Sequence, residues 1–510
     1  MGNESALFFS LHGASVEAVN QAGAYSPKDW GVLVAPTNRR PYGFDWEDWG
    51  RLDAKEVLGI VVDKYKPDPS RLYLTGHSMG GHGTWQFGVT YPGKWAAIAP
   101  SAGWYSFWSY AGKEEQKSPG PMEQIFTKSS NPSNTLALSK NYLSYGIYIL
   151  HGDKDDNVPV TQARFMREYL AGFHPDFCYY ERPGAGHWWG NECVDWPPMF
   201  EFMKSHRRPE AQDLKNIDFY TSSPAISSES RFITIWQQEK SLEISNVSLS
   251  QDTASREINI NCDNVLVLKL ALRHLQSGQP YQIICDTDSF KVDPGLHQDV
   301  FLRKGNNGWM IVEKPAAGEK GPQRSGLFKE AFQNNMIFVY GTNGNKEEND
   351  WAYQKARFDA ETFWYRGNGA IDVMSDKDFL QKGGEKRNVI LYGHSGMNAA
   401  WGKLIPNSPI TVSRGEITFG SESFKGDDLT AFFIFPRFDE ENTSVGVVAG
   451  TGRPGMISAI PNRYFVSGAG FPDFMIFRTE MLEKGIDGVV ASGFFDQKWE
   501  LSEHEFQIKK

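Results

Sequence analysis

The feature that most constrains this chain is a glycine-rich turn between a strand pattern and a helix pattern. The stretch Leu-Tyr-Leu-Thr-Gly-His-Ser-Met-Gly-Gly-His-Gly holds Gly-x-Ser-x-Gly between an expected strand, Leu72–Thr75, and an expected helix, Met79–Tyr91. A serine on such a tight turn takes strained dihedral angles, and neighbouring backbone passes too close to Gly76 and Gly80 for a β-carbon. The pattern predicts a nucleophile elbow, which presents the Ser78 hydroxyl at the carboxyl end of a strand.

Residues 1–208 around this turn alternate short apolar segments with helical patterns. Helices are expected at Asp53–Tyr65 and Val160–Leu170, among others. The expected strands are Ala6–Leu11, Val32–Ala35, Leu72–Thr75, Ala96–Ala99, Ile147–Leu150 and Phe177–Tyr180. This alternation is typical of an α/β domain with a mostly parallel sheet and helices on both faces.

Two further regions are expected, because 510 residues are too many for one compact core. Residues 215–315 contain short, β-branched, alternating segments such as Phe232–Trp236 and Val265–Leu270, which predict a β-rich module. Residues 316–510 again mix strand patterns with a long helical pattern at Glu348–Phe363, which predicts an α/β accessory domain.

A serine nucleophile needs a base and an orienting acid, which follow it in this order on loops after later strands. His187 lies on a glycine-rich loop after the strand Phe177–Tyr180 and is the expected base. Spacing alone does not choose the acid among three aspartates that follow the preceding strand. Asp155 is favoured because Pro159 starts a helix and leaves Asp155 in the middle of the loop, and Asp156 remains the alternative.

Two backbone N–H groups are expected to form the oxyanion hole. Met79 begins the helix after the elbow, and Ala14 follows the first strand, which runs into His12 and Gly13. His12 is expected to hold this loop by hydrogen bonds. His77 and His82 flank the nucleophile on the wrong side to serve as its base.

An aromatic cluster follows the strand Ala96–Ala99 on the side of the elbow. Trp104, Tyr105 and Trp108, together with Trp188 beside the base, could line a flat apolar cleft for aryl groups or sugar faces. A packed lid core explains the cluster equally well. Both interpretations stay open, and the four residues are candidates for substrate binding.

Composition and the remaining motifs exclude several classes of protein. A net charge of −10 argues against a nucleic-acid partner, and no apolar run is long enough for a membrane span. The four cysteines form no Cys-x-x-Cys pair, and no metal-binding or phosphate-binding motif is present, so no cofactor and no metal are expected. Gly-His-Ser-Gly-Met at residues 393–397 lacks the second glycine of an elbow, so it is not expected to hold a second nucleophile. Gly-x-Gly-x-x-Gly at residues 450–455 precedes an expected helix that Pro461 interrupts, so a glycine-rich turn is favoured there over a dinucleotide site.

Four motifs carry a resemblance to a known family. Leu-His-Gly, Gly-His-Ser-Met-Gly-Gly, His-Gly-x-x-Asp-x-x-Val-Pro and Gly-x-Gly-His occur in this order within about the first 200 residues. Together they resemble the catalytic domain of prolyl-oligopeptidase (S9-type) serine hydrolases, and are similar to feruloyl and acetyl carbohydrate esterases. The resemblance implies an α/β-hydrolase fold and places the catalytic acid on Asp155. The region with Phe-Trp-Tyr-Arg-Gly-Asn-Gly at residues 363–369 resembles an accessory domain of some bacterial S9-like proteins.

The chain departs from this family in two ways. No β-propeller precedes the catalytic region, and the sequence starts at the strand that would be third in the fold. Loss of an N-terminal segment with its signal peptide would explain the missing strands and would make the protein secreted or periplasmic. The compartment otherwise stays open.

These observations predict a serine hydrolase that forms an acyl-enzyme. The resemblance implies a peptidase, whereas the aromatic cluster and the missing propeller fit an esterase for carbohydrate or hydroxycinnamoyl esters. The expected partner is thus a small peptide or an ester, including esters linked to carbohydrate. A non-catalytic binding protein on a hydrolase scaffold is the second alternative, and it requires a broken triad.

Overall fold

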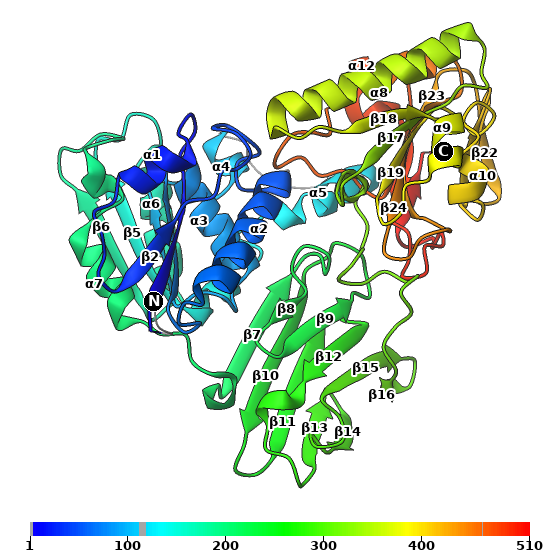
Figure 1. The fold of residues 1–510 in the computed structure, drawn as a ribbon. Helices are drawn as coiled ribbons and strands as arrows, with labels where there is room; N and C mark the ends of the chain where they lie inside the picture. Colours follow the sequence, from blue (N-terminus) through cyan, green and yellow to red (C-terminus); the bar gives the residue numbers. More distant parts are fainter. Residues whose placement is uncertain (1–3, 112–118, 462, 510) are drawn as a thin grey trace.

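A computed structural model describes residues 4–111, 119–461 and 463–509. Its strands form sheets in three successive parts of the chain, which span residues 6–182, 216–312 and 337–508 (Figure 1). None of the helices in the described residues is both long and apolar enough to cross a bilayer. The α/β-hydrolase class expected for the first part is confirmed, as are the β-rich sheets and the mixed sheet that follow.

The first part is built on a six-stranded parallel sheet with the order β2-β1-β3-β4-β5-β6. Its strands are β1 (Ala6–Leu11), β2 (Gly31–Val34), β3 (Leu72–His77), β4 (Ala97–Ser101), β5 (Gly146–Gly152) and β6 (Phe177–Arg182). Each expected strand is present within two residues of its expected start. All six carboxyl ends meet at one edge, where the loops that follow β1, β3, β5 and β6 come together.

Alternate side chains of these strands enter two separate cores, because successive residues of a strand point to opposite faces. Leu7, Phe9 and Leu74 pack under helices α2 (Asp48–Tyr65), α3 (Met79–Thr90) and α6 (Thr161–Ala171). Ala6, Phe8 and Tyr73 pack on the other face against α7 (Pro197–Ser205). The remaining helices of this part are α1 (Ala18–Gly23), α4 (Phe107–Tyr110) and α5 (Pro121–Ser129).

The second part, where the alternating pattern predicts a β-rich module, is a β-sandwich of two five-stranded sheets. One sheet has the order β14-β13-β11-β10-β7 and the other β16-β15-β12-β9-β8, with one apolar core between them. The strands are β7 (Asn216–Thr221), β8 (Glu229–Ser230), β9 (Ile233–Gln237), β10 (Ser245–Asp252), β11 (Glu257–Asp263), β12 (Val267–Ala271), β13 (Tyr281–Cys285), β14 (Asp288–Val292), β15 (Asp299–Gly305) and β16 (Gly308–Val312).

The third part contains an eight-stranded mixed sheet with the order β18-β17-β19-β24-β23-β25-β26-β27. Its strands are β17 (Ile337–Tyr340), β18 (Asp372–Ser375), β19 (Val389–Tyr392), β23 (Leu429–Pro436), β24 (Ser444–Gly450), β25 (Phe474–Arg478), β26 (Val489–Gly493) and β27 (Phe506–Ile508). The long helix α8 (Lys346–Gly367) packs on β17, β18 and β19. A small antiparallel sheet comprises β20 (Ile410–Ser413), β21 (Glu416–Phe419) and β22 (Glu422–Lys425), and the short helices are α9 (Asp376–Lys382), α10 (Trp401–Leu404), α11 (Arg453–Ser458) and α12 (Met481–Lys484).

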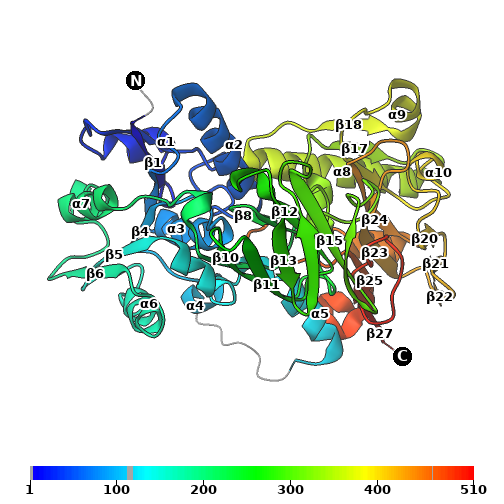
Figure 2. The ribbon, with the colours of Figure 1, turned by 90° about the horizontal axis from the view of Figure 1, so that it is seen from below.

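The first part contacts the third part through a segment that precedes and begins α2. Phe44 and Trp49 belong to the apolar core of the third part, where the Trp49 ring lies 5.8 Å from that of Phe363 and 5.4 Å from that of Phe465. The Trp49 indole N–H donates to the Phe332 carbonyl over 2.8 Å. Helix α2 lies on the side of the first part that faces the rest of the chain in both ribbon views (Figures 1 and 2).

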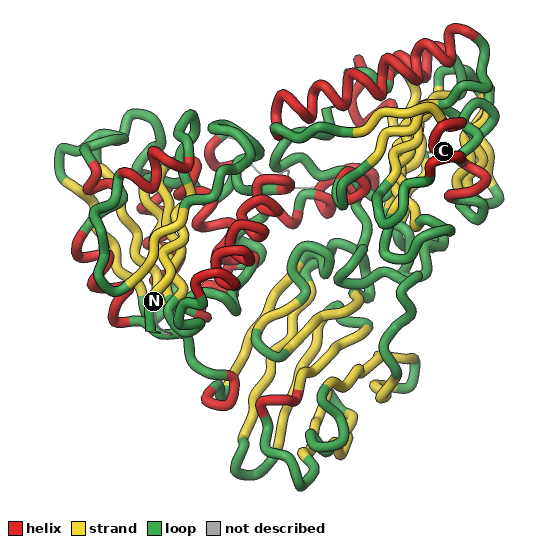
Figure 3. Tube along the Cα trace, viewed as in Figure 1, coloured by secondary structure: helices red, strands yellow, loops and turns green. Residues whose placement is uncertain are grey.

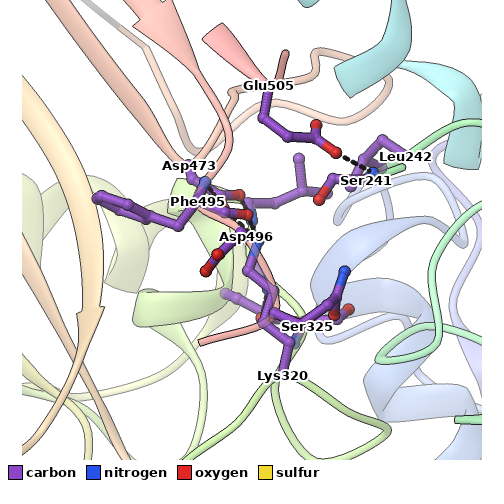
Figure 4. Close-up of polar contacts among 12 residues, drawn as sticks. Ser241, Leu242, Lys320, Ser325, Asp473, Phe495, Asp496 and Glu505 are labelled. Atoms are coloured by element: carbon purple, nitrogen blue, oxygen red, sulfur yellow. Dashed lines mark hydrogen bonds and ion pairs between the residues drawn. The ribbon is translucent and has the colours of Figure 1, made fainter. Parts of the chain in front are cut away.

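A buried ion pair anchors the segment that leads from the second part into the third. This segment runs as a loop between the β-sandwich and the mixed sheet (Figure 3). Lys320 Nζ lies 2.6 Å from Asp473 Oδ2 and donates to the Phe495 carbonyl, and Asp473 also accepts the N–H groups of Leu327 and Phe495 (Figure 4). These bonds satisfy both charges, as burial away from water requires. Lys320 thus fixes the end of the connection onto the mixed sheet.

Candidate active site

Ser78 occupies the predicted elbow between β3 and α3. Its dihedral angles are φ 60° and ψ −119°, a region that side chains other than glycine rarely adopt. A β-carbon at Gly80 would overlap the carbonyl oxygen of Leu11, and one at Gly76 would overlap that of Gly80. The two glycines therefore let α3 begin directly against the end of β1, and this contact holds the serine in its strained conformation.

The side chains of the predicted serine, base and acid form a continuous hydrogen-bonded series. His187 Nε2 lies 2.9 Å from Ser78 Oγ, and His187 Nδ1 lies 2.8 Å from Asp155 Oδ2 and 2.9 Å from Oδ1. The three residues come from the loops after β3, β5 and β6, so the parallel sheet brings together groups up to 109 residues apart. This arrangement allows the imidazole to take a proton from the serine while the carboxylate fixes its tautomer.

Asp155 is held by more groups than the base alone. Its Oδ1 accepts the backbone N–H groups of Asn157 and Val158, each over 2.9 Å, and its Oδ2 lies 3.2 Å from His151 Nε2. Burial disfavours the charged carboxylate, but the hydrogen bonds from His151, His187 and the two N–H groups outweigh it. The pKa of Asp155 therefore falls well below its usual range, and the group stays ionised.

His77 and Cys193 hold the loop that carries His187, the predicted base, and the sequence alone does not reveal this role for either residue. His77 is buried and its Nε2–H donates to the carbonyl oxygen of His187 over 2.8 Å. Burial, helped by the nearby His187, lowers the pKa of His77 to about 3, so this ring is neutral and donates from one nitrogen. The buried Cys193 thiol accepts the N–H of Trp189 over 3.1 Å. Position next to the nucleophile was the only sequence signal for His77.

The expected oxyanion donors lie on either side of Ser78. Met79 is the first residue of α3, and Ala14 lies in the loop after β1 and lines the cavity at Ser78. Within the described residues, neither N–H donates a hydrogen bond to another group, which leaves both available to a ligand. The loop is held by His12, whose Nε2 donates to the Thr37 carbonyl over 3.1 Å.

Ser78 and His187 open into a cavity of about 820 Å³. Apolar and aromatic side chains on its wall come from Val16, Val19, Tyr42 and Trp188. Besides Ser78, His187 and His77, the wall carries a hydroxyl and amides, which come from Ser15, Asn20, Gln21, Asn157 and Asn191. No carboxylate, lysine or arginine is among the described residues that line it, so the cavity suits an uncharged ligand.

The four aromatic candidates lie in different places. Trp188 is 52% exposed and lines the cavity. Trp104 is only 6% exposed, and its ring stacks on His82 and on Tyr110. Tyr105 stacks on Phe165 at 4.5 Å.

Trp108 is half-buried in α4. None of the three residues on the α4 side is among the described residues that line the cavity, so their positions favour the packed-lid interpretation. Asp156, the alternative candidate for the acid, is exposed. All four cysteines are free thiols.

Comparisons with known proteins agree with this geometry at the level of the family. Residues 32–206 match the model of the Prolyl oligopeptidase family, Peptidase S9. The chain is 24% identical over 534 residues to an "Uncharacterized secreted protein" of Arthroderma benhamiae, a match that covers 97% of this chain. The chain spans 55% of the length of that relative.

Solved structures similar to this chain include hydrolases with different names. A thermostable esterase is 21% identical and covers 40% of this chain and 56% of its own, with a TM-score of 0.29. The S-formylglutathione hydrolase of Staphylococcus aureus is 16% identical, with coverages of 40% and 85% and a TM-score of 0.31. A puromycin-hydrolyzing peptidase of Mycobacterium tuberculosis is 19% identical, with coverages of 40% and 34% and a TM-score of 0.32.

Proposed function

We propose that this chain, whose first part is an α/β-hydrolase domain of the prolyl oligopeptidase family, hydrolyses uncharged carboxylic esters with Ser78 as the nucleophile. The hydrogen-bonded series Ser78–His187–Asp155 on a strained elbow carries the proposal. A non-catalytic binding protein, in contrast, would have no reason to retain this geometry.

The reaction follows from the positions of these groups. Ser78 Oγ attacks the carbonyl carbon while its proton passes to His187 Nε2, and the N–H groups of Ala14 and Met79 stabilise the negative charge on the oxygen. The bond to the leaving alcohol breaks as His187 returns the proton to the alcohol oxygen. Water then attacks the acyl-enzyme by the same proton transfers, which releases the acid and restores Ser78.

The cavity wall favours an uncharged substrate over a peptide terminus. Recognition of a free α-amine or α-carboxylate needs an opposite charge, because a buried unpaired charge is costly. The described wall residues offer amides, a hydroxyl and apolar surface instead. The exposed Trp188 beside His187 gives a flat face for an aryl group or a sugar ring.

A peptidase is the second candidate, and the match of residues 32–206 to the Prolyl oligopeptidase family favours it. The same triad would then cleave an amide, with an amine in place of the alcohol as leaving group. The two candidates differ only in the substrate and share every catalytic residue.

A labelling and turnover experiment tests both candidates. The wild type and the Ser78→Ala variant are treated with a fluorophosphonate and assayed on p-nitrophenyl acetate, methyl ferulate and proline-containing p-nitroanilides. We expect labelling of the wild type, at least about 100-fold higher kcat/KM on an ester than on the anilides, and a loss of about 10⁴-fold or more in Ser78→Ala.

Ser395→Ala is the matched control, because Ser395 lies in the other Gly-His-Ser turn and donates to the Val412 carbonyl over 2.8 Å. It should label and turn over as the wild type does. Comparable rates on anilides and esters would favour the peptidase. A folded wild type that neither labels nor turns over would contradict both candidates.

A further inference from the structure

A basic pocket lies at the opposite edge of the parallel sheet from Ser78. It has a volume of about 300 Å³, and its charged wall residues are Lys55, Lys94, Arg208, Arg231 and Glu229. Lys94 precedes the amino end of β4, whereas Ser78 follows the carboxyl end of β3. The pocket is therefore separate from the catalytic cavity and lies between the first part and the β-sandwich.

Four segments of the chain place the four cations around this space, and contacts orient three of them. Arg208 Nη1 donates to the Gly93 carbonyl over 2.8 Å, and Arg231 Nη1 donates to the Pro209 carbonyl over 3.3 Å. Lys55 projects from α2, with its Nζ 5.1 Å from the centre of the Tyr91 ring. These contacts fix the direction of the side chains without neutralising their charge.

The four cations have few anionic neighbours. Within the described residues, none of them forms an ion pair within 4.0 Å, whereas the buried Lys320 and Lys329 each pair with an aspartate. Glu229 is the one carboxylate among the described wall residues, and it is exposed. Arg208 also has a buried Nε that lacks a hydrogen-bond partner there.

The charges also repel one another. Burial is the largest cause that lowers the pKa of each of these four side chains. Other cations of the pocket lower the pKa of Lys94 and Arg231 further, and Arg51, which lies outside the pocket, lowers that of Lys55. Glu229 opposes the shift at the two lysines, and Glu210 opposes it at the two arginines. The pKa of Arg231 is still about 10, so this group keeps its charge at neutral pH.

We propose that this pocket binds a small oxyanion with more than one negative charge, namely a phosphate or sulfate group. Two guanidinium groups present planar donor pairs that match the spacing of such oxygens, and two lysines add point charges. A chain with a net charge of −10 has no general attraction for anions, so this concentration of positive charge is local. The volume exceeds that of a bare ion and leaves room for an organic group attached to it.

Calorimetric titration of the full chain with inorganic phosphate tests the proposal, at low and constant ionic strength because salt screens such sites. We expect saturable binding that weakens about tenfold or more in Lys94→Met, since this change removes one charge without removing a hydrogen bond of the described residues. Glu229→Gln should tighten binding severalfold, a gain that misfolding cannot produce.

Lys64→Met is the matched control, because Lys64 is exposed on the same helix as Lys55 and also lies over a tyrosine ring, that of Tyr65. Its phosphate affinity should stay within about twofold of the wild type. Titrations with sulfate and with glucose 6-phosphate distinguish the sources. Equal affinities support a free ion as ligand, and tighter binding of the sugar phosphate supports an organic phosphate.

The proposal is overturned if phosphate and sulfate give no saturable heat at 10 mM, a concentration about tenfold above a millimolar Kd. It is also overturned if Lys94→Met and Glu229→Gln both bind phosphate as the wild type does, since the ion would then bind elsewhere. Neither result depends on ester or peptide turnover, so the outcome is independent of the proposed function.

Discussion

Asp155 and Asp156 are adjacent and chemically identical, but their surroundings differ completely. The Asp155 carboxylate is buried against His187, His151 and two backbone N–H groups, whereas Asp156 is exposed. Local sequence favoured Asp155 because of its place in the loop, but the contacts that distinguish the two arise from the loop's three-dimensional path. Of the two, only Asp155 contacts His187 and is placed to fix the tautomer of this proposed base.

We therefore predict that Asp155→Asn lowers kcat by about 10⁴-fold with a small effect on KM, because the amide would stabilise the wrong tautomer of His187. Asp156→Asn, the matched control, should keep kcat within about twofold. Steady-state kinetics on p-nitrophenyl acetate measure both. Equal losses in the two variants would contradict the assignment.

The pH dependence of thermal stability in the wild type and in Asp155→Asn gives a second test of the Asp155 contacts. The folded-state pKa of Asp155 is lowered, so its contribution to the free energy of unfolding is present above about pH 3.9, the ordinary aspartate value, and is lost as the pH falls below it. The difference in Tm between the wild type and Asp155→Asn should shrink below about pH 4.

The order of Ser78, Asp155 and His187 was predictable because each follows a recognisable strand. The roles of His77 and Cys193 were not, since they depend on how the base-carrying loop packs back on the elbow. The Nε2–H of His77 reaches a carbonyl 110 residues away. The position of Trp104 was not predictable from the sequence either, because an aromatic segment has the same sequence pattern whether it lines a cleft or fills the core of a lid.

At the scale of single elements, the contact between β1 and α3 is the tightest constraint on the elbow. The expected strands and helices fall close to the observed ones because their apolar periodicity is strong. Helix α2 is the exception, since it begins at Asp48 rather than Asp53. Its first turn carries Trp49, which faces a different part of the molecule, so the periodicity of the helix's own core does not extend that far.

Gly80→Ala should destabilise the protein by several kcal/mol and reduce fluorophosphonate labelling, because the β-carbon would force α3 away from β1 and move the Met79 N–H. Gly59→Ala, in the middle of α2, is the matched control. A β-carbon at Gly59 meets no atom within 4 Å, so this change should stabilise the helix by about 0.5–1 kcal/mol.

Thermal unfolding and labelling of the two variants test this prediction. Opposite signs of the change in Tm would support the packing argument for the elbow. A Gly80→Ala variant with the Tm and labelling rate of the wild type would contradict it.

At the scale of the whole molecule, the first and third parts share an apolar core. Phe44 and Trp49 come from the first part, and Phe363 and Phe465 come from the third. The pattern of apolar residues changes near residues 208 and 315, and these changes predicted three regions. They were recognisable because helices and strands place their apolar residues at different spacings. No local pattern could predict this shared core, since Trp49 and Phe363 meet only after both parts have folded.

Trp49→Ala should lower the free energy of unfolding by about 3–5 kcal/mol and separate the melting of the first and third parts. Trp49 is 5% exposed, and its indole N–H is bonded to the Phe332 carbonyl. Trp364→Ala is the control, because this side chain is 54% exposed at the rim of the same contact, beside Arg40.

Scanning calorimetry measures both variants. We expect a loss of about 1 kcal/mol or less in Trp364→Ala and a single transition. A single transition of unchanged Tm in Trp49→Ala would show that the two parts are joined by other contacts.

The shared core also bears on how such a protein can evolve. The chain's obvious boundary, near residue 208, is not a boundary of its packing, because the hydrolase part contributes Trp49 to a core built mainly by the last third of the chain. A recombination event at that boundary would deliver an α/β-hydrolase domain with an indole ring exposed to water. The first and third parts should therefore be inherited together, and substitutions around Trp49 should be tolerated only alongside changes near Phe363 and Phe465.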